Sequence, residues 1–249
     1  MTRLLDVGAP SICLLGGLVG DVDDFYFLDH SPGSFQPPPA PLTGHADDVV
    51  PVEEMDLIGG EACLDLVNTG AGRRVGPFRE KLRTYGDLVT WAERLDLIDA
   101  GRGAVLRRLA ERRPGDAARV LEEARALREA VYRVFTASTG GESPAPDDLT
   151  RIGEAAGRAA ASRRLVATED GFDYAWLEDD SLERPLWPAA ISAAELATMG
   201  DLTRVKECAS ENCNWLFIDE SRNRSRRWCD MKDCGNRAKA RRFRQRKRT

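Results

Sequence analysis

Apolar residues between positions 52 and 200 recur mostly at intervals of three and four, which is the period of amphipathic helices. One helix is predicted over 87–95, with its apolar side chains on a single face. A longer helix follows, with apolar residues spaced 4-3-4-3 over 120–134, and we expect Asp116 to cap it. A third helix is predicted over 147–162.

The period changes from about 3.6 to 2 beyond residue 162. Residues 165–168 and 172–177 alternate around a Glu-Asp-Gly turn, which predicts a β-hairpin. An alanine-rich helix over 188–199 then leads directly into the C-terminal part, so we expect a short linker and two units that pack together. The fold class predicted is α+β: a mainly α-helical body with a small β-hairpin, followed by a small C-terminal domain.

Four of the six cysteines lie in the last fifth of the chain, at Cys208, Cys213, Cys229 and Cys234. Their spacing is C-x4-C, fifteen residues, then C-x4-C. In a reducing compartment, two close pairs favour tetrahedral thiolate ligation of one zinc ion per chain. A disulfide framework and an iron–sulfur cluster are the alternatives. The only two histidines lie within the first 50 residues, which favours a site made of cysteines alone.

The fifteen residues between the cysteine pairs predict a small hairpin, with strands at 214–218 and 226–228. Trp215, Phe217 and Trp228 would form its core, although aromatic side chains of this kind can also stack on nucleic-acid bases. A unit of about 35 residues cannot build a sufficient core alone, so we expect it to unfold without its metal.

Charge is distributed very unevenly along the 249 residues, although the net charge is only −5. Residues 201–249 hold 15 basic and 7 acidic side chains, a net charge of +8, which leaves −13 for residues 1–200. Asymmetry of this kind suggests a C-terminal module that binds a polyanion.

A basic helix is predicted directly after Cys234, because eight of the twelve residues 237–248 are cationic and most are good helix formers. Phosphate contacts would turn their mutual repulsion into attraction, whereas the alternative is a solvated basic tail. Asn236, Ala240 and Phe243 form a narrow stripe that we expect to dock on the zinc module. The candidate nucleic-acid contacts are Arg222, Arg224, Arg226, Arg227, Arg237, Lys239, Arg241, Arg242, Arg244 and Arg246.

The run from Cys208 to Arg237, including the tetrapeptide Cys-Gly-Asn-Arg at 234–237, closely resembles the CGNR zinc finger over about 205–246. Upstream, Gly-Gly-Glu-Ala-Cys-Leu-Asp-Leu-Val-Asn-Thr at 59–69 resembles the opening of the ABATE domain, which usually precedes this finger in bacterial proteins. The resemblance implies a stress-related transcription regulator, and RNA binding has also been suggested for the family.

Residues 1–50 lie outside this resemblance. They are rich in proline between 32 and 41 and carry seven acidic residues against one basic residue, which resists packing. We expect a disordered or loosely attached leader at 1–50, with an over-called start codon as an alternative. The ABATE-like domain is then predicted over 51–200 and the finger over 201–249.

Signatures of an enzyme are missing from the sequence: there is no glycine-rich phosphate loop, zinc-protease histidine pair or nucleophile elbow. Asp65, Asn68 and Thr69 are polar residues in an apolar run and are candidates for a small-ligand pocket. The alternative is that they hydrogen-bond to the end of a helix or strand.

The predicted function is therefore that of a zinc-dependent regulator that binds nucleic acid, DNA before RNA, and whose body senses a signal or mediates assembly. A protein-interaction module that uses the basic tail, and an enzyme with a finger as scaffold, are the alternatives; we expect no enzyme. No run approaches the roughly 18 apolar residues of a membrane span, and we expect a cytoplasmic protein. A small-molecule effector and a homodimer remain open.

Overall fold

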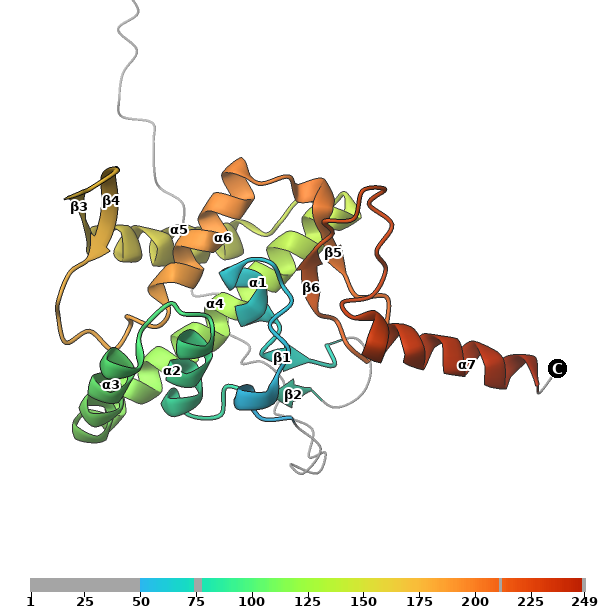
Figure 1. The fold of residues 1–249 in the computed structure, drawn as a ribbon, viewed down its shortest axis with the longest axis horizontal. Helices are drawn as coiled ribbons and strands as arrows, with labels where there is room; N and C mark the ends of the chain where they lie inside the picture. Colours follow the sequence, from blue (N-terminus) through green and yellow to red (C-terminus); the bar gives the residue numbers. More distant parts are fainter. Residues whose placement is uncertain (1–49, 74–77, 211, 248–249) are drawn as a thin grey trace, which may run out of the picture. The chain divides into compact units, whose positions relative to one another are not determined.

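The computed structural model describes residues 50–73, 78–210 and 212–247 (Figure 1). The leader predicted at 1–50 therefore lies outside the described residues, except for its last position. None of the helices in the described part is long and apolar enough to cross a membrane.

The body is mainly helical, as the sequence pattern predicts. Its helices are α1 (Ala62–Val67), α2 (Tyr85–Arg94), α3 (Ala100–Arg112), α4 (Pro114–Gly140), α5 (Pro146–Ala161) and α6 (Trp187–Met199). The longest of them, α4, contacts each of the other five, so it forms the centre of the body (Figure 1). Leu127 and Phe135 from α4 and Trp91 from α2 are among the fully buried side chains of this core.

Local capping explains where two of these helices begin. Thr84 and Asp87 form a capping box at the start of α2, in which each side chain accepts a hydrogen bond from the backbone of the other. The cap predicted for α4 is wrong: Asp116 lies inside the first turn and pairs with Arg113 at 2.8 Å. Pro114 begins this helix instead, because its fixed φ suits the first helical position.

The predicted β-hairpin is confirmed as β3 (Arg163–Thr168) and β4 (Gly171–Trp176), an antiparallel pair. Gly171 has a φ of 140°, a conformation that residues with a side chain rarely adopt, so glycine suits the turn. A second, shorter pair consists of β1 (Gly70–Ala71) and β2 (Arg79–Glu80) and lies beside the C-terminal module, since Gly72 donates its amide to the carbonyl of Cys213.

The C-terminal module contains β5 (Val205–Glu207), β6 (Leu216–Ile218), a π-helical turn η4 (Met231–Gly235) and α7 (Asn236–Arg246). Its two strands pair with each other, so the second strand predicted at 226–228 is wrong. The reason lies in Asp219, whose carboxylate accepts the backbone amides of Ser221 and Arg226 and closes a loop where the return strand was expected.

Body and module share one hydrophobic core. Val205 and Leu216 of the module are buried in the same cluster as the core of the body. Ile218 donates its amide to the carbonyl of Gly59, and Tyr132 of α4 donates its hydroxyl to Glu207 at 2.8 Å. These contacts hold the base of the module firmly on the body.

Candidate zinc centre and nucleic-acid interface

The first cysteine pair is folded by a tight turn after β5. The amide of Cys208 donates to the carbonyl of Trp215 at 2.8 Å, and that of Cys213 donates to Ser210 at 3.1 Å. Asn214 follows with a φ of 65°, a left-handed conformation that asparagine tolerates better than most residues. Its side chain is buried and donates to Glu207 at 2.9 Å, which holds the turn.

The second pair is formed by the turn η4. The carboxylate of Asp230 accepts the amide of Lys232 at 2.8 Å and so caps this turn. Gly235 leaves room for Met231, because a Cβ there would lie 2.8 Å from the methionine sulfur. Asn236 donates its side-chain amide to the carbonyl of Lys232 at 2.9 Å. Both residues that follow the last cysteine thus shape the passage from the metal site into α7.

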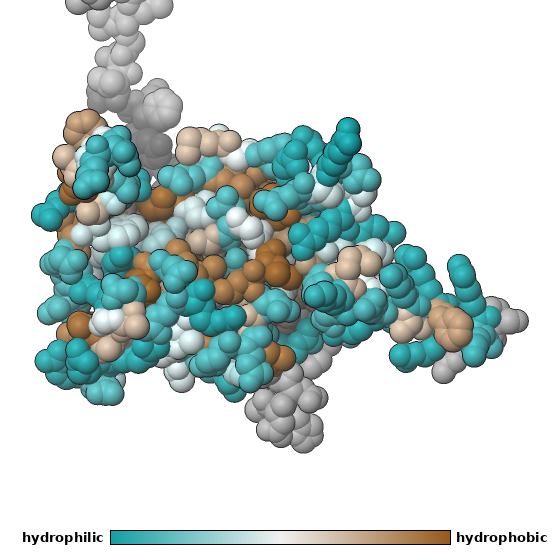
Figure 2. All heavy atoms as spheres, in the orientation of Figure 1, coloured by the Kyte–Doolittle hydropathy of each residue, from teal (hydrophilic) through white to brown (hydrophobic). Residues whose placement is uncertain are grey.

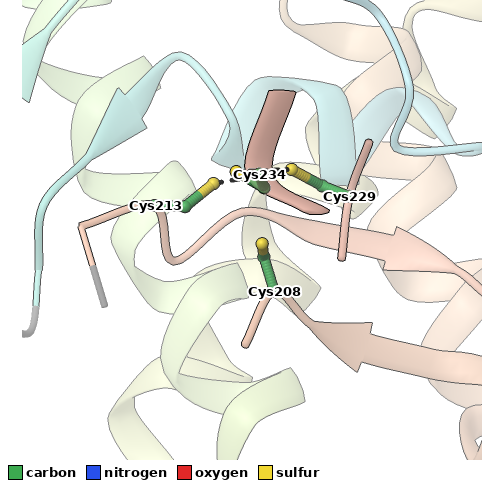
Figure 3. A group of neighbouring side chains, drawn as sticks. All are labelled: Cys208, Cys213, Cys229 and Cys234. Atoms are coloured by element: carbon green, nitrogen blue, oxygen red, sulfur yellow. Dashed lines mark hydrogen bonds between the residues drawn. The ribbon is translucent and has the colours of Figure 1, made fainter. Parts of the chain in front are cut away.

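The four thiols converge on one point (Figure 3). All four sulfur atoms lie within 4.8 Å of one another, with 3.6 Å between Cys213 and Cys229 and 3.7 Å between Cys229 and Cys234. A tetrahedral zinc ion with Zn–S bonds of about 2.3 Å separates its sulfur ligands by about 3.8 Å, whereas a disulfide requires about 2.05 Å. The donor set therefore fits one zinc ion, as the sequence predicts.

The core of the module surrounds this cluster. Phe217 is fully buried and packs against the four cysteines, and Trp215 and Trp228 are partly buried against them. The expectation that these aromatic side chains serve as core is thus confirmed. Arg226 stacks its guanidinium 4.4 Å from the centre of the Phe217 ring and donates to the carbonyl of Cys229.

Cations from two elements offset the charge of the centre. Four thiolates around one Zn²⁺ carry a net charge of about −2. Arg237 of α7 donates one nitrogen to the sulfur of Cys234 at 3.1 Å and to the carboxylate of Asp233 at 2.8 Å. Lys81, which follows β2 in the body, is buried on the side of Cys213, and burial together with the nearby Arg79 lowers its pKa. The body thus contributes directly to the surroundings of the metal.

The thiols influence one another as well. Hydrogen bonds from the neighbouring thiols, that of Cys208 first, lower the pKa of Cys234, and the contact with Arg237 acts in the same direction. The thiols of Cys208, Cys213 and Cys234, together with burial, raise the pKa of Cys229. Four ionised thiols at this spacing therefore require a cation among them.

At least four of the ten candidate nucleic-acid residues make internal contacts, and one of them is Arg227, whose guanidinium lies 5.4 Å from the centre of the Trp228 ring. Arg226 and Arg237 surround the metal centre, and Arg224 pairs with Asp201 at 3.1 Å and donates to Thr203 at 2.7 Å. Arg222, Arg227, Lys239, Arg242, Arg244 and Arg246 are exposed, and Arg241 is half-buried.

Helix α7 presents its cations to solvent. None of its residues is buried, and within the described chain no carboxylate pairs with Lys239, Arg241, Arg242 or Arg244. The predicted docking of the stripe from Asn236 to Phe243 on the module is wrong, since the Phe243 side chain is 61% exposed. Asn236 at the start of the stripe bonds to the carbonyl of Lys232 in η4, whereas Ala240 is exposed like Phe243.

The polar trio in the body lies at the end of α1 and just beyond. Asp65 accepts the amide of Gly59 at 2.9 Å, and burial raises the pKa of its carboxyl to about 6, against the effect of that hydrogen bond. Asn68 exchanges two hydrogen bonds of 2.9 Å with the backbone of Leu216 in β6. Thr69 donates to Leu66 at 2.6 Å. All three are buried and bond to the protein, and their role in ligand binding stays a prediction.

Two features were missed at the level of sequence. One is the pair of hydrogen bonds between the Asn68 side chain and the backbone of Leu216 in β6, where a neighbouring strand would otherwise bind. The other is a cleft of about 390 Å³ between body and module, lined by Glu54, Lys81, Trp215 and Asp233 among others. No local sequence pattern predicts either feature, because both arise from residues far apart in the chain.

Comparison with known proteins agrees with this architecture. No curated protein matches the chain at a significant level. Residues 204–247 match the family model of the CGNR zinc finger. Residues 60–200 match that of ABATE, described as "Putative stress-induced transcription regulator". Neither is an enzyme family. The chain belongs to the ABATE family and carries a CGNR zinc finger at its C-terminal side.

Proposed function

We propose that the protein is a zinc-dependent regulator of transcription that binds DNA through α7, while its ABATE body senses a signal or mediates assembly. The observation that supports this most is the row of solvent-facing cations on α7, which begins directly at the metal centre. A regulator of the kind that the family description names needs such a surface for nucleic acid.

The geometry of α7 suits the major groove of duplex DNA. Lys239, Arg242 and Arg246 recur at intervals of three and four and share one face, and Arg241 and Arg244 lie beside them. A single α-helix fits the roughly 12 Å width of the major groove of DNA, whereas the corresponding groove of duplex RNA is too narrow for side chains to read. This difference favours DNA over RNA.

The zinc centre sets where the helix begins. Cys234 lies in η4, which continues into α7 without a break, and Arg237 of α7 donates to both the Cys234 sulfur and the carboxylate of Asp233 in η4. Loss of the metal should release this anchor, so that DNA binding should require zinc. Arg222 and Arg227, exposed in the loop before the second cysteine pair, would add contacts to the phosphate backbone.

A small-molecule signal would act at the cleft between body and module. Its volume of about 390 Å³ suits a small ligand, and its wall includes both body residues and three of the zinc-binding cysteines. A ligand there would bear on the metal centre and on the start of α7 at once.

The experiment is a selection of bound fragments from a mixture of genomic DNA and total RNA, with zinc-loaded protein. We expect enrichment of duplex DNA, and loss of that enrichment when Arg241, Arg242 and Arg244 are all changed to Gln. The control changes three exposed arginines of the body, Arg108, Arg112 and Arg151, to Gln. Equal retention by both triple variants, or no enrichment by the parent, would refute the proposal. Enrichment of RNA alone would refute the preference for DNA.

A further inference from the structure

The β3–β4 hairpin has an apolar face that its own chain leaves largely open. Leu165 is paired opposite Tyr174 and Ala167 opposite Phe172, so these side chains share one face. Leu165 is 61% exposed, Phe172 77% and Tyr174 56%. Figure 2 shows hydrophobic surface at the hairpin, which lies at the upper left as in Figure 1. Large apolar side chains gathered in this way mark an interaction surface.

Within the described chain, the hairpin is attached to the body at its base. Trp176 stacks on Trp187 of α6 with 5.4 Å between ring centres, and Leu177 donates its amide to Ser162 at 2.8 Å. Beyond that point both outer edges of the two-stranded sheet are unpaired within the described chain. A sheet of two strands is only marginally stable without further packing. Its tip is thus suited to packing against a partner.

The charges on the hairpin indicate what this partner is. Arg163 and Arg164 lie at the base, whereas Glu169 and Asp170 form the turn at the tip. None of these four residues forms an ion pair within the described part of the chain, and the Arg163 guanidinium lies 4.1 Å from the centre of the Tyr174 ring, at the edge of the apolar face. When a second copy of this face is turned by 180°, its acidic tip lies opposite the basic base of the first copy, and its basic base lies opposite the acidic tip. A surface of that kind fits a second copy of itself.

We propose that two copies of this chain associate through their hairpins, face to face and tip to base. Leu165, Phe172 and Tyr174 of each copy are then covered by those of the other, and the acidic tip of each approaches Arg163 of the other. The exposed parts of these three side chains amount to roughly 400 Å² per copy, half of the about 800 Å² that each partner buries in a standard interface. An interface of this small size is typical of a reversible association. The inference does not depend on nucleic-acid binding.

Sedimentation equilibrium of the full zinc-loaded chain, without nucleic acid, tests the proposal between about 1 and 100 µM. We expect a monomer–dimer equilibrium that is weakened at least tenfold by the double change Leu165→Ser and Phe172→Ser. The matched control is Met199→Ser at the end of α6, because that side chain is 76% exposed but lies outside the hairpin. Circular dichroism reports whether each variant remains folded.

A charge exchange keeps the test decisive if the serine variant does not fold. Arg163→Glu and Glu169→Arg should each weaken the dimer roughly tenfold, and the two changes in one chain should restore it. Six residues of extended strand separate the two positions by roughly 20 Å, so restoration cannot come from a contact within one hairpin. A parent that stays monomeric at 100 µM, a dimer indifferent to the hairpin changes, or a double exchange that fails to restore the dimer would each overturn the proposal.

Discussion

Replacing Asn68 by alanine removes two of the hydrogen bonds through which the body holds strand β6, while the bond from Ile218 to Gly59 remains. In the structure the side-chain amide donates to the carbonyl of Leu216, and its oxygen accepts the amide of the same residue, each at 2.9 Å. Both residues are completely buried, so water cannot replace the lost partners. An orphaned buried backbone group costs about 1–3 kcal/mol, so two of them should lower the free energy of unfolding by about 2–6 kcal/mol.

The effect should be visible at the strand itself and at the metal. Hydrogen exchange at the Leu216 amide should accelerate roughly 30- to 20,000-fold, because each 1.4 kcal/mol corresponds to a factor of about ten. Zinc transfer to a chelator should also accelerate, since β6 leads into the core around the cysteines. The matched control is Asn223→Ala, which removes an exposed asparagine whose side chain bonds only within its loop, and should change stability by less than about 0.5 kcal/mol.

An Asn68→Ala variant with the denaturation midpoint and the Leu216 exchange rate of the parent would refute this reasoning. It would mean that the other contacts between body and module, among them the hydrogen bond from Ile218 to Gly59, are sufficient to hold β6 in place.

Three further changes probe the metal centre and the body. Cys229→Ser should abolish stoichiometric zinc and unfold the module while the helical body stays folded, which elemental analysis and circular dichroism would show; a variant that retains one zinc per chain would contradict it. Arg237→Gln removes the donor at 3.1 Å from the Cys234 sulfur, so zinc release to a chelator should be faster, and a rate equal to that of the parent would exclude this role. The pKa of Asp65 in the folded protein is about 6, above its value in the unfolded chain, so ionisation of Asp65 lowers the free energy of unfolding as pH rises. Between pH 5 and 7 this decrease amounts to about 1 kcal/mol, and Asp65→Asn should abolish it. The urea midpoint of the variant should therefore shift less between these two pH values than that of the parent.

Much of the zinc centre can be predicted from local sequence. The four cysteines, their spacing and the absence of other soft ligands in the C-terminal part are sufficient to predict a zinc site, and the thiols converge accordingly. Helix positions also follow, because the period of apolar residues is a local property. The bounds of α2 and α5 differ by one or two residues from the predicted ones, since the capping box at Thr84 and the proline at the first position of α5 decide where these helices begin.

Contacts between distant residues were beyond prediction. Strand β6 pairs with the upstream β5, because Asp219 draws the downstream segment into a closed loop. Asn68 lies 148 residues from Leu216, and a single polar side chain carries no signal of such a partner. The solvent exposure of Phe243 was missed for a related reason: an apolar stripe on a helix predicts a docked face only if another element lies opposite.

Binding of DNA by α7 is tested most directly by titrating one duplex with zinc-loaded protein over a range of salt concentrations. If about five phosphates are neutralised, log affinity should fall against log salt with a slope near −4 to −5. Changing Arg241, Arg242 and Arg244 together to Gln should keep the zinc content and make the slope shallower by about two to three units, at about one per lost phosphate contact. A variant that binds DNA with the affinity and the slope of the parent would show that the cations of α7 are only a solvated tail.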